Sequence, residues 1–368
     1  MQHASRIIMT LPTPSLIIDL AIAQRNIGRL ADYSRRHSIG IRPHTKTHKS
    51  VRMAKLQLDA GAVGLTAAKV SEAATMSEAS DDLLIAYPAL DPWRTERIAT
   101  LAKTKTVRVG VDSTLAVDRI ASAAREAGVT VGILVDLDVG LHRTGVQSPQ
   151  AALHLAQHVA RTAGVRLDGI MFYPGHIRQP LDQQQPLLAG ISAMIEETIT
   201  LWRRHGLEAQ IVSGGSSPSA YQSHHIKHLT EIRPGTYIYN DMSMVSAGHA
   251  SLDECAAKVR CTVVSTAVPG KFVIDAGSKT LTQDRRSKDP ETAGFGHILE
   301  YPLAKISRLT EEHGEVDASQ CPTRPNLGDT VHVIPNHICP CVNLQSILWI
   351  HEAGDFHPTP VDARGQVW

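Results

Sequence analysis

The stretch Ile39–Lys49, IGIRPHTKTHK, joins a short apolar strand to a basic loop. In this loop Lys46 lies between the imidazoles of His44 and His48 and close to two further cations. Neighbouring positive charge and partial burial both favour the uncharged form of an amine. Because Schiff-base formation with an aldehyde requires an uncharged amine, the loop is a candidate active-site segment. A basic surface loop is the alternative interpretation, which the rest of the sequence disfavours.

Apolar strands alternate with helical patterns through the first two-thirds of the chain. The strands are predicted at Leu16–Ile18, just before Arg42, and at Val63–Thr66, Leu83–Ala86, Thr106–Val109, Val131–Val135, Leu167–Met171, Gln210–Val212 and Glu231–Gly235. About eight strand–helix units with short connections predict an α/β fold, a parallel sheet closed into a TIM-like (β/α)8 barrel over residues 25–245. A doubly wound open sheet is the alternative, but the Gly-rich dinucleotide turn typical of that fold does not follow the first strand.

After about residue 245 the pattern changes to short strands separated by turns. The predicted strands are Val259–Ala267, Lys271–Asp275, Thr330–Ile334 and Ser346–Ile350. Because few helical patterns separate them, they predict a C-terminal, mostly antiparallel β-domain over residues 246–368. The polar segment Thr282–Thr292 is predicted to be a loop.

The composition disfavours several classes of partner. The chain has 368 residues, 42% of them apolar, and a formal net charge of +1, so neither nucleic acid nor an acidic membrane is an expected partner. It contains no apolar run long enough to span a membrane, and Met1–Thr10 lacks the apolar region of a signal peptide. Five cysteines without such a signal predict reduced thiols or metal ligands, and therefore a cytoplasmic protein.

Two loops that follow predicted barrel strands carry candidate site residues, because reactive groups gather at the C-terminal strand ends of such barrels. The loop Asp136–Gly145, DLDVGLHRTG, contains Arg143, which could bind a phenolate or a carboxylate by charge-assisted hydrogen bonds. The segment Phe172–His176, FYPGH, offers Tyr173 and His176. An ordinary surface loop, a core tyrosine and a satisfied loop histidine are the alternatives.

The Gly/Ser turn Ser213–Ser219, SGGSSPS, is a candidate phosphate site. Small residues expose backbone N–H groups and hydroxyls, and the phosphate sites of barrels cluster near the last two strands. The segment Pro234–Asp241, PGTYIYND, could close the same pocket. The alternative is a turn without a ligand.

Near the C-terminus, the segment Pro335–Asn343, PNHICPCVN, is a candidate metal site. On an extended strand His337 and Cys339 would face the same way, and an imidazole with a thiolate could hold a divalent metal with open coordination positions. Cys339 could instead pair with Cys341, or both thiols could simply be buried. Since the chain has no CxxC pairs, a closed structural zinc site is not expected.

Taken together, these motifs resemble the D-threonine aldolase and D-serine dehydratase family, within the alanine-racemase-like, fold-type III class of pyridoxal-phosphate enzymes. The matching motifs are TPS at Thr13–Ser15 with Asp19, RPHTKTHKS, AAKVSEA at Ala67–Ala73, DVGLHRTGV, FYPGH, SGGSSPS, RPGTYIYND, EEHG at Glu311–Gly314, and PNHICPCVN. The resemblance implies that residues 1–24 contribute a strand to the β-domain. It also implies a homodimer with active sites near the interface.

The resemblance assigns a role to each candidate residue. Lys46 would bind pyridoxal phosphate as a Schiff base, Arg143 would lie beside the phenolic oxygen, and Tyr173 would lie near the ring nitrogen. The phosphate would be held by Gly214, Gly215, Ser216, Ser217 and Tyr237. His337 and Cys339 would bind a divalent metal, zinc or manganese, beside the cofactor.

The implied activity is that of a lyase for a small D-3-hydroxy amino acid. The first choice is retro-aldol cleavage of D-threonine to glycine and acetaldehyde, with His48 or His176 as the base. The alternative is dehydration of D-serine or D-3-hydroxyaspartate to a 2-oxo acid and ammonia. Aldolases of the family tend to have Asp at the position of Cys339, favouring manganese, whereas dehydratases tend to have Cys, favouring zinc.

An amino-acid racemase and a non-catalytic pyridoxal-phosphate carrier are remoter alternatives. A racemase of this class commonly takes a catalytic Tyr from its C-terminal domain, where this chain has the His/Cys pair instead. Carriers are single barrels without a second domain.

Overall fold

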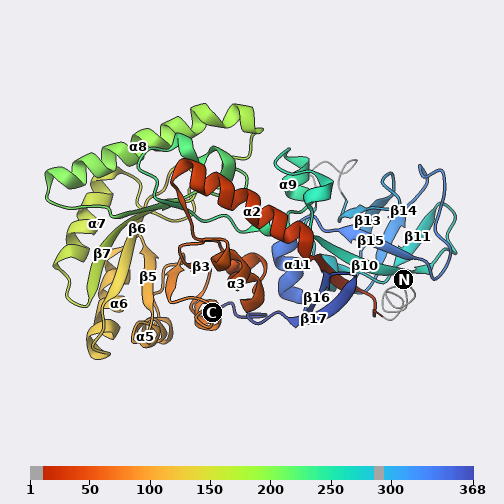
Figure 1. Cartoon of the computed structure of the whole chain (residues 1–368), viewed down its shortest axis with the longest axis horizontal. Coiled ribbons are helices and arrows are strands. Elements are labelled where there is room, and N and C mark those ends of the chain that lie inside the picture. The colour runs from red at the N-terminus through yellow and green to blue at the C-terminus, as the bar shows by residue number, and fades with distance from the viewer. Residues whose placement is uncertain (1–10, 286–293) are drawn as a thin grey trace. The chain divides into compact units, whose positions relative to one another are not determined.

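The computed structural model describes residues 11–285 and 294–368. The prediction for Met1–Thr10 and most of the predicted loop Thr282–Thr292 lie outside these residues. The chain forms two compact units (Figure 1). The β-domain unit joins the chain up to Ile27 with Thr236–Gly365, and the barrel unit joins Gly28–Gly235 with Gln366–Trp368.

The described part of the barrel unit contains eight parallel strands, which confirms the predicted fold class. In the order β2-β9-β8-β7-β6-β5-β4-β3 they are Gly40–Ile41, Glu231–Ile232, Ile211–Gly214, Val165–Met171, Val131–Asp136, Thr106–Val111, Asp82–Ile85 and Leu65–Ala67. A parallel bridge between His44 and Thr66 joins the two ends of this series. Most of the strands are buried runs of Val, Ile and Leu, as expected for a parallel sheet covered by helices.

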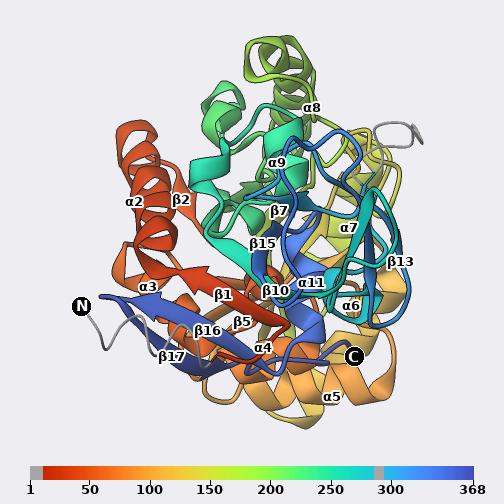
Figure 2. The same cartoon turned by 90° about the vertical axis from the view of Figure 1, so that its right-hand side faces the viewer.

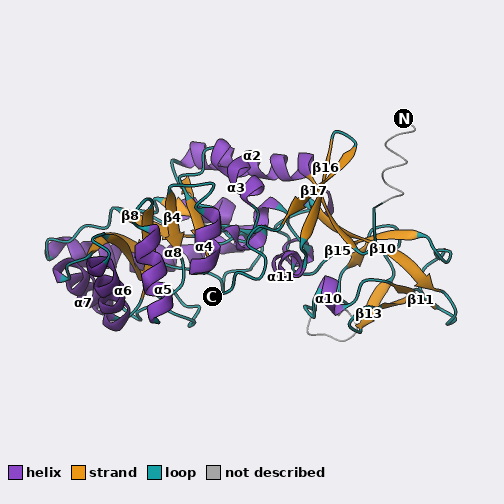
Figure 3. Ribbon diagram, turned by 90° about the horizontal axis from the view of Figure 1, so that it is seen from below, coloured by secondary structure: helices purple, strands orange, loops and turns teal. Residues whose placement is uncertain are grey.

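Helices alternate with these strands and lie along their outer side, as Figure 3 shows for α5, α6 and α7. The helices are α2 (Leu20–His37), α3 (Val51–Asp59), α4 (Val70–Met76), α5 (Pro92–Leu101), α6 (Thr114–Glu126), α7 (Pro149–Arg161) and α8 (Gln184–Arg204), with 3-10 turns at Thr45–Thr47, Leu181–Gln183 and Ala220–His225. Asp91, Ser113 and Ser148 begin α5, α6 and α7, because each side chain accepts a hydrogen bond from the N–H three residues later.

Ion pairs cross the interior of the barrel unit. Arg42 donates to Glu231 at 2.9 Å and to Asp82 at 2.6 Å. Arg108 donates to the same Asp82 at 2.6 Å and to Asp168 at 2.7 Å. Removing one partner of a fully buried pair typically costs about 3–5 kcal/mol, because the other charge stays buried without compensation, and Arg42 and Glu231 form such a pair. These pairs therefore fix the strands that carry the loops of the candidate site.

The β-domain unit is built on one mixed sheet with nine strands in the described ranges. Its main path β13-β14-β11-β10-β1-β16-β17 comprises Lys305–Leu309, Gly314–Asp317, Lys271–Ile274, Ala257–Ser265, Ser15–Asp19, Ile347–Glu352 and Asp355–Pro360, while β12 (His297–Ile298) and β15 (Thr330–Ile334) pair off this path. Strand β1 pairs antiparallel with β10 and parallel with β16 (Figure 2), so the first described residues do contribute a strand to this domain.

Short helices of the β-domain unit lie close to the predicted metal motif. They are α9 (Met242–Ser246), α10 (Ser278–Leu281) and α11 (Ile338–Leu344), with 3-10 turns at Thr236–Ile238 and Leu252–Glu254. None of the helices in the described ranges combines the length and apolarity needed to cross a bilayer.

The predicted extended conformation of the His337–Cys339 segment is wrong. His337 is the N-cap of α11, with extended backbone, and Cys339 lies in the first turn of that helix. Pro340 is compatible with a first turn, where backbone N–H groups have no partner inside the helix. Cys341 does not share a face with Cys339 in a strand. It is buried, donates to the carbonyl oxygen of Thr280 at 3.0 Å, and burial raises its pKa to about 12.

Candidate active site

Lys46 is half-buried and lies on the 3-10 turn Thr45–Thr47, which the residues Arg42–His44 connect to the end of β2. The hydroxyl of Thr45 donates to Oε1 of Glu72 at 2.5 Å, and the N–H of Ala68 donates to Oε2 at 3.1 Å. Glu72 is fully buried on α4, and burial raises its pKa despite the hydrogen bond from Thr45 and the charge of Lys49. One buried carboxylate thus connects the lysine turn to the loop that follows β3.

The two imidazoles that flank Lys46 have different environments. His48 is fully buried, and its Nδ1 accepts from the N–H of Ser50 at 3.1 Å. Its Nε2 therefore carries the proton and donates to Gln57 at 3.1 Å. Burial lowers the pKa of His48 to about 4, so it stays neutral at neutral pH. Because both ring nitrogens of His48 already form hydrogen bonds, His48 would have to give up one of these partners to act as the base.

His44 has a buried Nδ1 for which the described residues provide no hydrogen-bond partner. Burial, followed by the charges of Lys46 and Arg233, lowers the pKa of His44 well below its usual value. A neutral imidazole with an unpaired buried nitrogen two residues from Lys46 is suited to a polar ligand at this position.

The loop after β6 brings Arg143 to Tyr173. The guanidinium of Arg143 lies 4.9 Å from the centroid of the Tyr173 ring. Asp138 shapes the loop, because its Oδ1 accepts from the N–H groups of Gly140, Leu141 and His142, each at 3.0 Å. The loop conformation is therefore fixed by its own carboxylate, and it places a cation against an aromatic ring.

His176 is exposed and its ring lies against Gly140 of the same loop. Gly140 has a φ of +114°, and a Cβ built there would come within 3.3 Å of Nε2 of His176. A side chain at this position would be strained and would press on the imidazole. The glycine therefore leaves room for His176 beside the loop that carries Arg143.

The predicted phosphate segment follows β8 as a compact turn. Gly214 lies under Phe172, since a Cβ there would be 2.1 Å from the Phe172 ring. The hydroxyls of Ser216 and Ser219 are 2.9 Å apart, and Ser217 Oγ accepts from the N–H of Gly235 at 3.2 Å. These small residues keep hydroxyls and backbone close together, as a phosphate site requires. Gly215 continues this turn with a φ of +79°, whereas Tyr237 is buried in the β-domain unit.

The predicted metal ligands His337 and Cys339 are brought together in the β-domain unit. Their side chains form a hydrogen bond, which, with the charges of Asp241 and Asp284, outweighs burial and raises the pKa of His337 to about 8. The hydroxyl of Thr236 lies 3.7 Å from Sγ of Cys339. No group of three or more His, Cys, Asp or Glu side chains suited to a metal occurs in residues 11–285 and 294–368.

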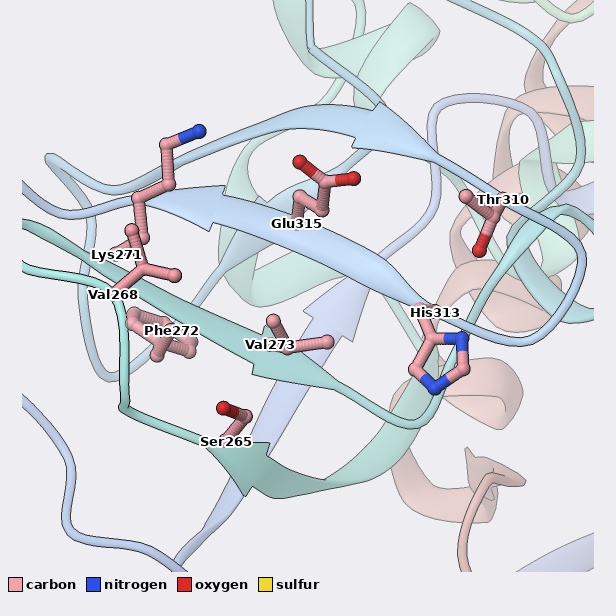
Figure 4. Close-up of a pocket in the computed structure, with 8 residues that line it drawn as sticks. All are labelled: Ser265, Val268, Lys271, Phe272, Val273, Thr310, His313 and Glu315. Carbon is pink, nitrogen blue, oxygen red and sulfur yellow. The ribbon is translucent and has the colours of Figure 1, made fainter.

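A separate hollow of about 270 Å³ lies on the β-domain sheet (Figure 4). Its lining comes from β10, β11, β14 and the turns before β11 and β14, and consists of Ser265, Val268, Lys271, Phe272, Val273, Thr310, His313 and Glu315. None of the residues predicted for the active site lines it, so it is distinct from the lysine turn and from the His337–Cys339 pair.

Glu72 and Asp241 are residues near the candidate site for which the sequence predicted no role. Glu72 lies in the AAKVSEA motif and Asp241 ends the PGTYIYND motif. Both carboxylates are buried. An acidic residue within a short, partly apolar motif is the signal that could have identified them. Such a residue is expected to be buried, and a buried carboxylate needs hydrogen-bond partners.

Comparison with known proteins identifies the family. The model of the alanine racemase N-terminal domain matches residues 18–243, and a serine dehydratase domain model matches residues 256–350. The chain is 30% identical to 3-hydroxy-D-aspartate aldolase of Paracoccus denitrificans, over 96% of this chain and 92% of the relative. The chain belongs to the D-threonine aldolase and D-serine dehydratase family. It is therefore an enzyme of a pyridoxal-phosphate-dependent lyase family.

Two further members of the family are similar over almost their whole length. The chain is 30% identical to D-threo-3-hydroxyaspartate dehydratase of Delftia sp., covering 90% of this chain and 92% of that one. The crystal structure of D-threonine aldolase from Filomicrobium marinum matches with a TM-score of 0.89 and 30% identity, covering 97% and 96% of the two chains. Structures of the dehydratase include a histidine-to-alanine variant and, two positions further on, a cysteine-to-alanine variant in the metal-free form.

The residues present fit the cofactor of this family. The lysine turn offers an amine together with the unpaired buried nitrogen of His44, and the turn after β8 offers clustered hydroxyls. They also fit a divalent metal, because an imidazole and a thiol are already within hydrogen-bond distance of each other. Borderline metals such as zinc accept both donor types.

Proposed function

We propose that this protein is a metal-dependent lyase of D-3-hydroxy amino acids that cleaves D-threonine to glycine and acetaldehyde. The observation that supports the aldol reaction is the exposed imidazole of His176, which packs on Gly140 in the loop that carries Arg143. Retro-aldol cleavage needs a base for the hydroxyl proton, and imidazole is the side chain best suited to that role near neutral pH.

Each remaining residue has a binding or orienting role in this proposal. Lys46 attaches the cofactor, Arg143 and Tyr173 contact its ring substituents, and Tyr237 joins the turn Gly214–Ser217 in holding its phosphate. Bound pyridoxal phosphate supplies an electron sink for the Cα–Cβ bond that breaks. His176 takes the hydroxyl proton, the carbonyl of acetaldehyde forms, and a proton returns to Cα to give glycine.

His337 and Cys339 hold the metal in the proposal. A bound divalent cation supplies Lewis acidity toward the hydroxyl of the substrate. The two protein donors leave positions for water or substrate, which is the arrangement of catalytic rather than structural zinc sites. We also propose that the protein is a homodimer, as the family resemblance implies.

Dehydration to a 2-oxo acid and ammonia is the second candidate, and Cys339 is the observation that favours it. In this reaction Lys46 removes the Cα proton and the hydroxyl group leaves from Cβ. A thiolate ligand suits zinc better than manganese. The dehydratase variants in histidine and in cysteine have the same two-residue spacing as His337 and Cys339.

Product analysis distinguishes the two reactions. The purified holoenzyme is incubated with D-threonine, D-serine and D-threo-3-hydroxyaspartate, with and without a chelator. Glycine and acetaldehyde from D-threonine support the aldolase, whereas a 2-oxo acid and ammonia support the dehydratase. Absence of both products from all three substrates would overturn both candidates.

A pair of histidine variants tests the base. His176→Asn should lower kcat for aldol cleavage by about 10²–10⁴-fold, the usual contribution of a general base, with the cofactor absorption band retained. His48→Gln should not produce this loss, because both nitrogens of His48 are occupied. If His48→Gln removed aldol activity and His176→Asn did not, the assignment of the base would be wrong.

A further inference from the structure

Asp241 is a buried carboxylate that begins one helix and contacts the first residue of another. Its side chain is almost fully buried, and the residue is the N-cap of α9. Oδ1 accepts from the N–H of Met244 at 3.0 Å, and Oδ2 accepts from the N–H of Ile338 at 3.1 Å. One side chain therefore satisfies backbone donors at the N-termini of both α9 and α11.

The contact between Asp241 and Ile338 lies between the two proposed metal donors. Ile338 is the residue between His337 and Cys339, and its N–H belongs to the peptide that joins it to His337. Fixing this peptide restricts the backbone from which both donor side chains extend. His337 itself has no side-chain capping bond to hold the start of α11, so Asp241 supplies the cap from another part of the chain.

Further hydrogen bonds connect α9 to the same segment. The N–H of Met242 donates to the carbonyl oxygen of Pro335 at 3.1 Å. The N–H and the hydroxyl of Ser243 donate to the carbonyl oxygen of Asn336 at 3.1 and 2.6 Å. The first turn of α9 thus contacts the backbone of Pro335 and Asn336, and its N-cap Asp241 contacts the backbone of Ile338, between the two donors.

We propose that Asp241 is a positioning residue for the metal, which holds His337 and Cys339 in the geometry of a ligand pair. This inference rests on the proposed metal site. Asp241 acts through the backbone, because both of its oxygens already accept backbone hydrogen bonds. Charge-assisted hydrogen bonds of this kind are stronger than neutral ones, and residues that orient metal ligands typically change metal affinity about 10–100-fold.

The test measures metal affinity rather than turnover. The variant is Asp241→Asn in the full-length holoenzyme, and the readouts are zinc bound after dialysis against a graded chelator and the thiolate-to-cobalt absorption band after cobalt substitution. We expect the dissociation constant for zinc to rise about 10–100-fold and the cobalt band to shift or weaken. The amide presents one oxygen to the two N–H groups, so one of them loses its acceptor.

Two matched variants separate positioning from loss of stability or of charge. Ser243→Ala removes a hydroxyl contact between α9 and Asn336 but leaves the contact to Ile338 intact. Asp284→Asn removes a carboxylate 3.9 Å from His337 that does not contact the N–H of Ile338, and it reports the effect of a lost neighbouring charge alone. Ser243→Ala should keep the metal affinity of the unmodified protein, and Asp284→Asn should change it less than Asp241→Asn does. Equal losses of affinity in Ser243→Ala and Asp241→Asn would contradict the proposal.

Asp241→Glu keeps the test decisive if the Asn variant fails to fold. It retains the charge and displaces the oxygens by one methylene, so we expect a smaller rise of the dissociation constant than in Asp241→Asn. Folded Asp241→Asn or Asp241→Glu with unchanged zinc affinity and cobalt spectrum would overturn the inference. If the unmodified protein bound no zinc or cobalt, the proposed metal site itself would fail, which is a distinguishable result.

Discussion

The lysine turn and the His337–Cys339 segment have the same construction in two different units. Each presents reactive side chains on a short turn or first helical turn, and each is held by one buried carboxylate from another element. Glu72 holds the lysine turn through the side chain of Thr45, whereas Asp241 holds the His337–Cys339 segment through the backbone of Ile338. Glu72 accepts from a side chain, so a substitution of either Thr45 or Glu72 removes that hydrogen bond. Asp241 accepts from a backbone N–H, so only a substitution of Asp241 removes that one.

The largest expected effect is that of Lys46→Ala, which should remove the cofactor from the lysine turn and leave the metal bound at His337 and Cys339. Lys46→Ala should abolish the visible absorption band of the bound cofactor and lower activity at least about a thousandfold, because it removes the attaching amine. Metal content should stay unchanged, since no metal donor is altered. Absorption spectra and metal analysis of the same preparation check both parts. Retention of the cofactor band would contradict the role of Lys46.

Removal of the proposed metal ligand His337 should lower activity somewhat less than removal of Lys46 does. His337→Ala should remove the metal and keep the cofactor band, with activity lower by about 10²–10³-fold, because Lewis-acid stabilisation is worth several kcal/mol. Cys321→Ser, which alters a half-exposed thiol of the same unit, is the control and should keep the metal. Metal bound stoichiometrically to His337→Ala would remove this histidine from the metal site.

The protonation of His48, next to the lysine turn, should make the free energy of unfolding depend on pH. Its pKa is about 4 in the folded protein against an ordinary value of 6.5, so the unfolded chain takes up the proton first as pH falls. The contribution to stability is complete above pH 6.5 and is lost as pH falls toward 4, roughly 3 kcal/mol in total. Denaturant unfolding at a series of pH values should show this loss in the unmodified protein and a weaker dependence in His48→Gln. Equal slopes for the two proteins would contradict the buried, neutral state of His48.

The smallest expected effect concerns the hydrogen bond between Thr45 and Glu72. Thr45→Val and Glu72→Gln should each lower the free energy of unfolding by about 1–3 kcal/mol, because each leaves a buried polar group without its partner. The double variant should cost less than the sum of the two, since the residues share one hydrogen bond. Strict additivity in urea unfolding would show that the contact does not hold the lysine turn.

The sequence predicted the barrel better than the conformation of the His337–Cys339 segment, for physical reasons. A run such as Val131–Val135 is buried on both faces, so its apolar pattern directly predicts β6 at Val131–Asp136. The spacing of His337 and Cys339 suits a strand or a helix start, and the helix is decided by Pro340 in its first turn together with buried Ile338 and Cys341. Spacing alone therefore singled out two side chains that do interact in the structure, but it predicted the wrong backbone conformation.

The two holding carboxylates could not be predicted from local patterns. Glu72 and Thr45 are 27 residues apart, and Asp241 and Ile338 are 97 residues apart. Such contacts depend on which strands and helices become neighbours. The motifs containing Glu72 and Asp241 carried the family resemblance, but only the folded chain brings each carboxylate to its partner.

The most direct test of the account is the identity of the lysine that carries the cofactor. The holoenzyme is reduced with borohydride, which makes the cofactor linkage permanent, and is then digested and sequenced by mass spectrometry. We predict a phosphopyridoxyl group on Lys46 and an unmodified Lys49 three residues away. A label on Lys49, or on any lysine outside the turn Thr45–Thr47, would contradict the account.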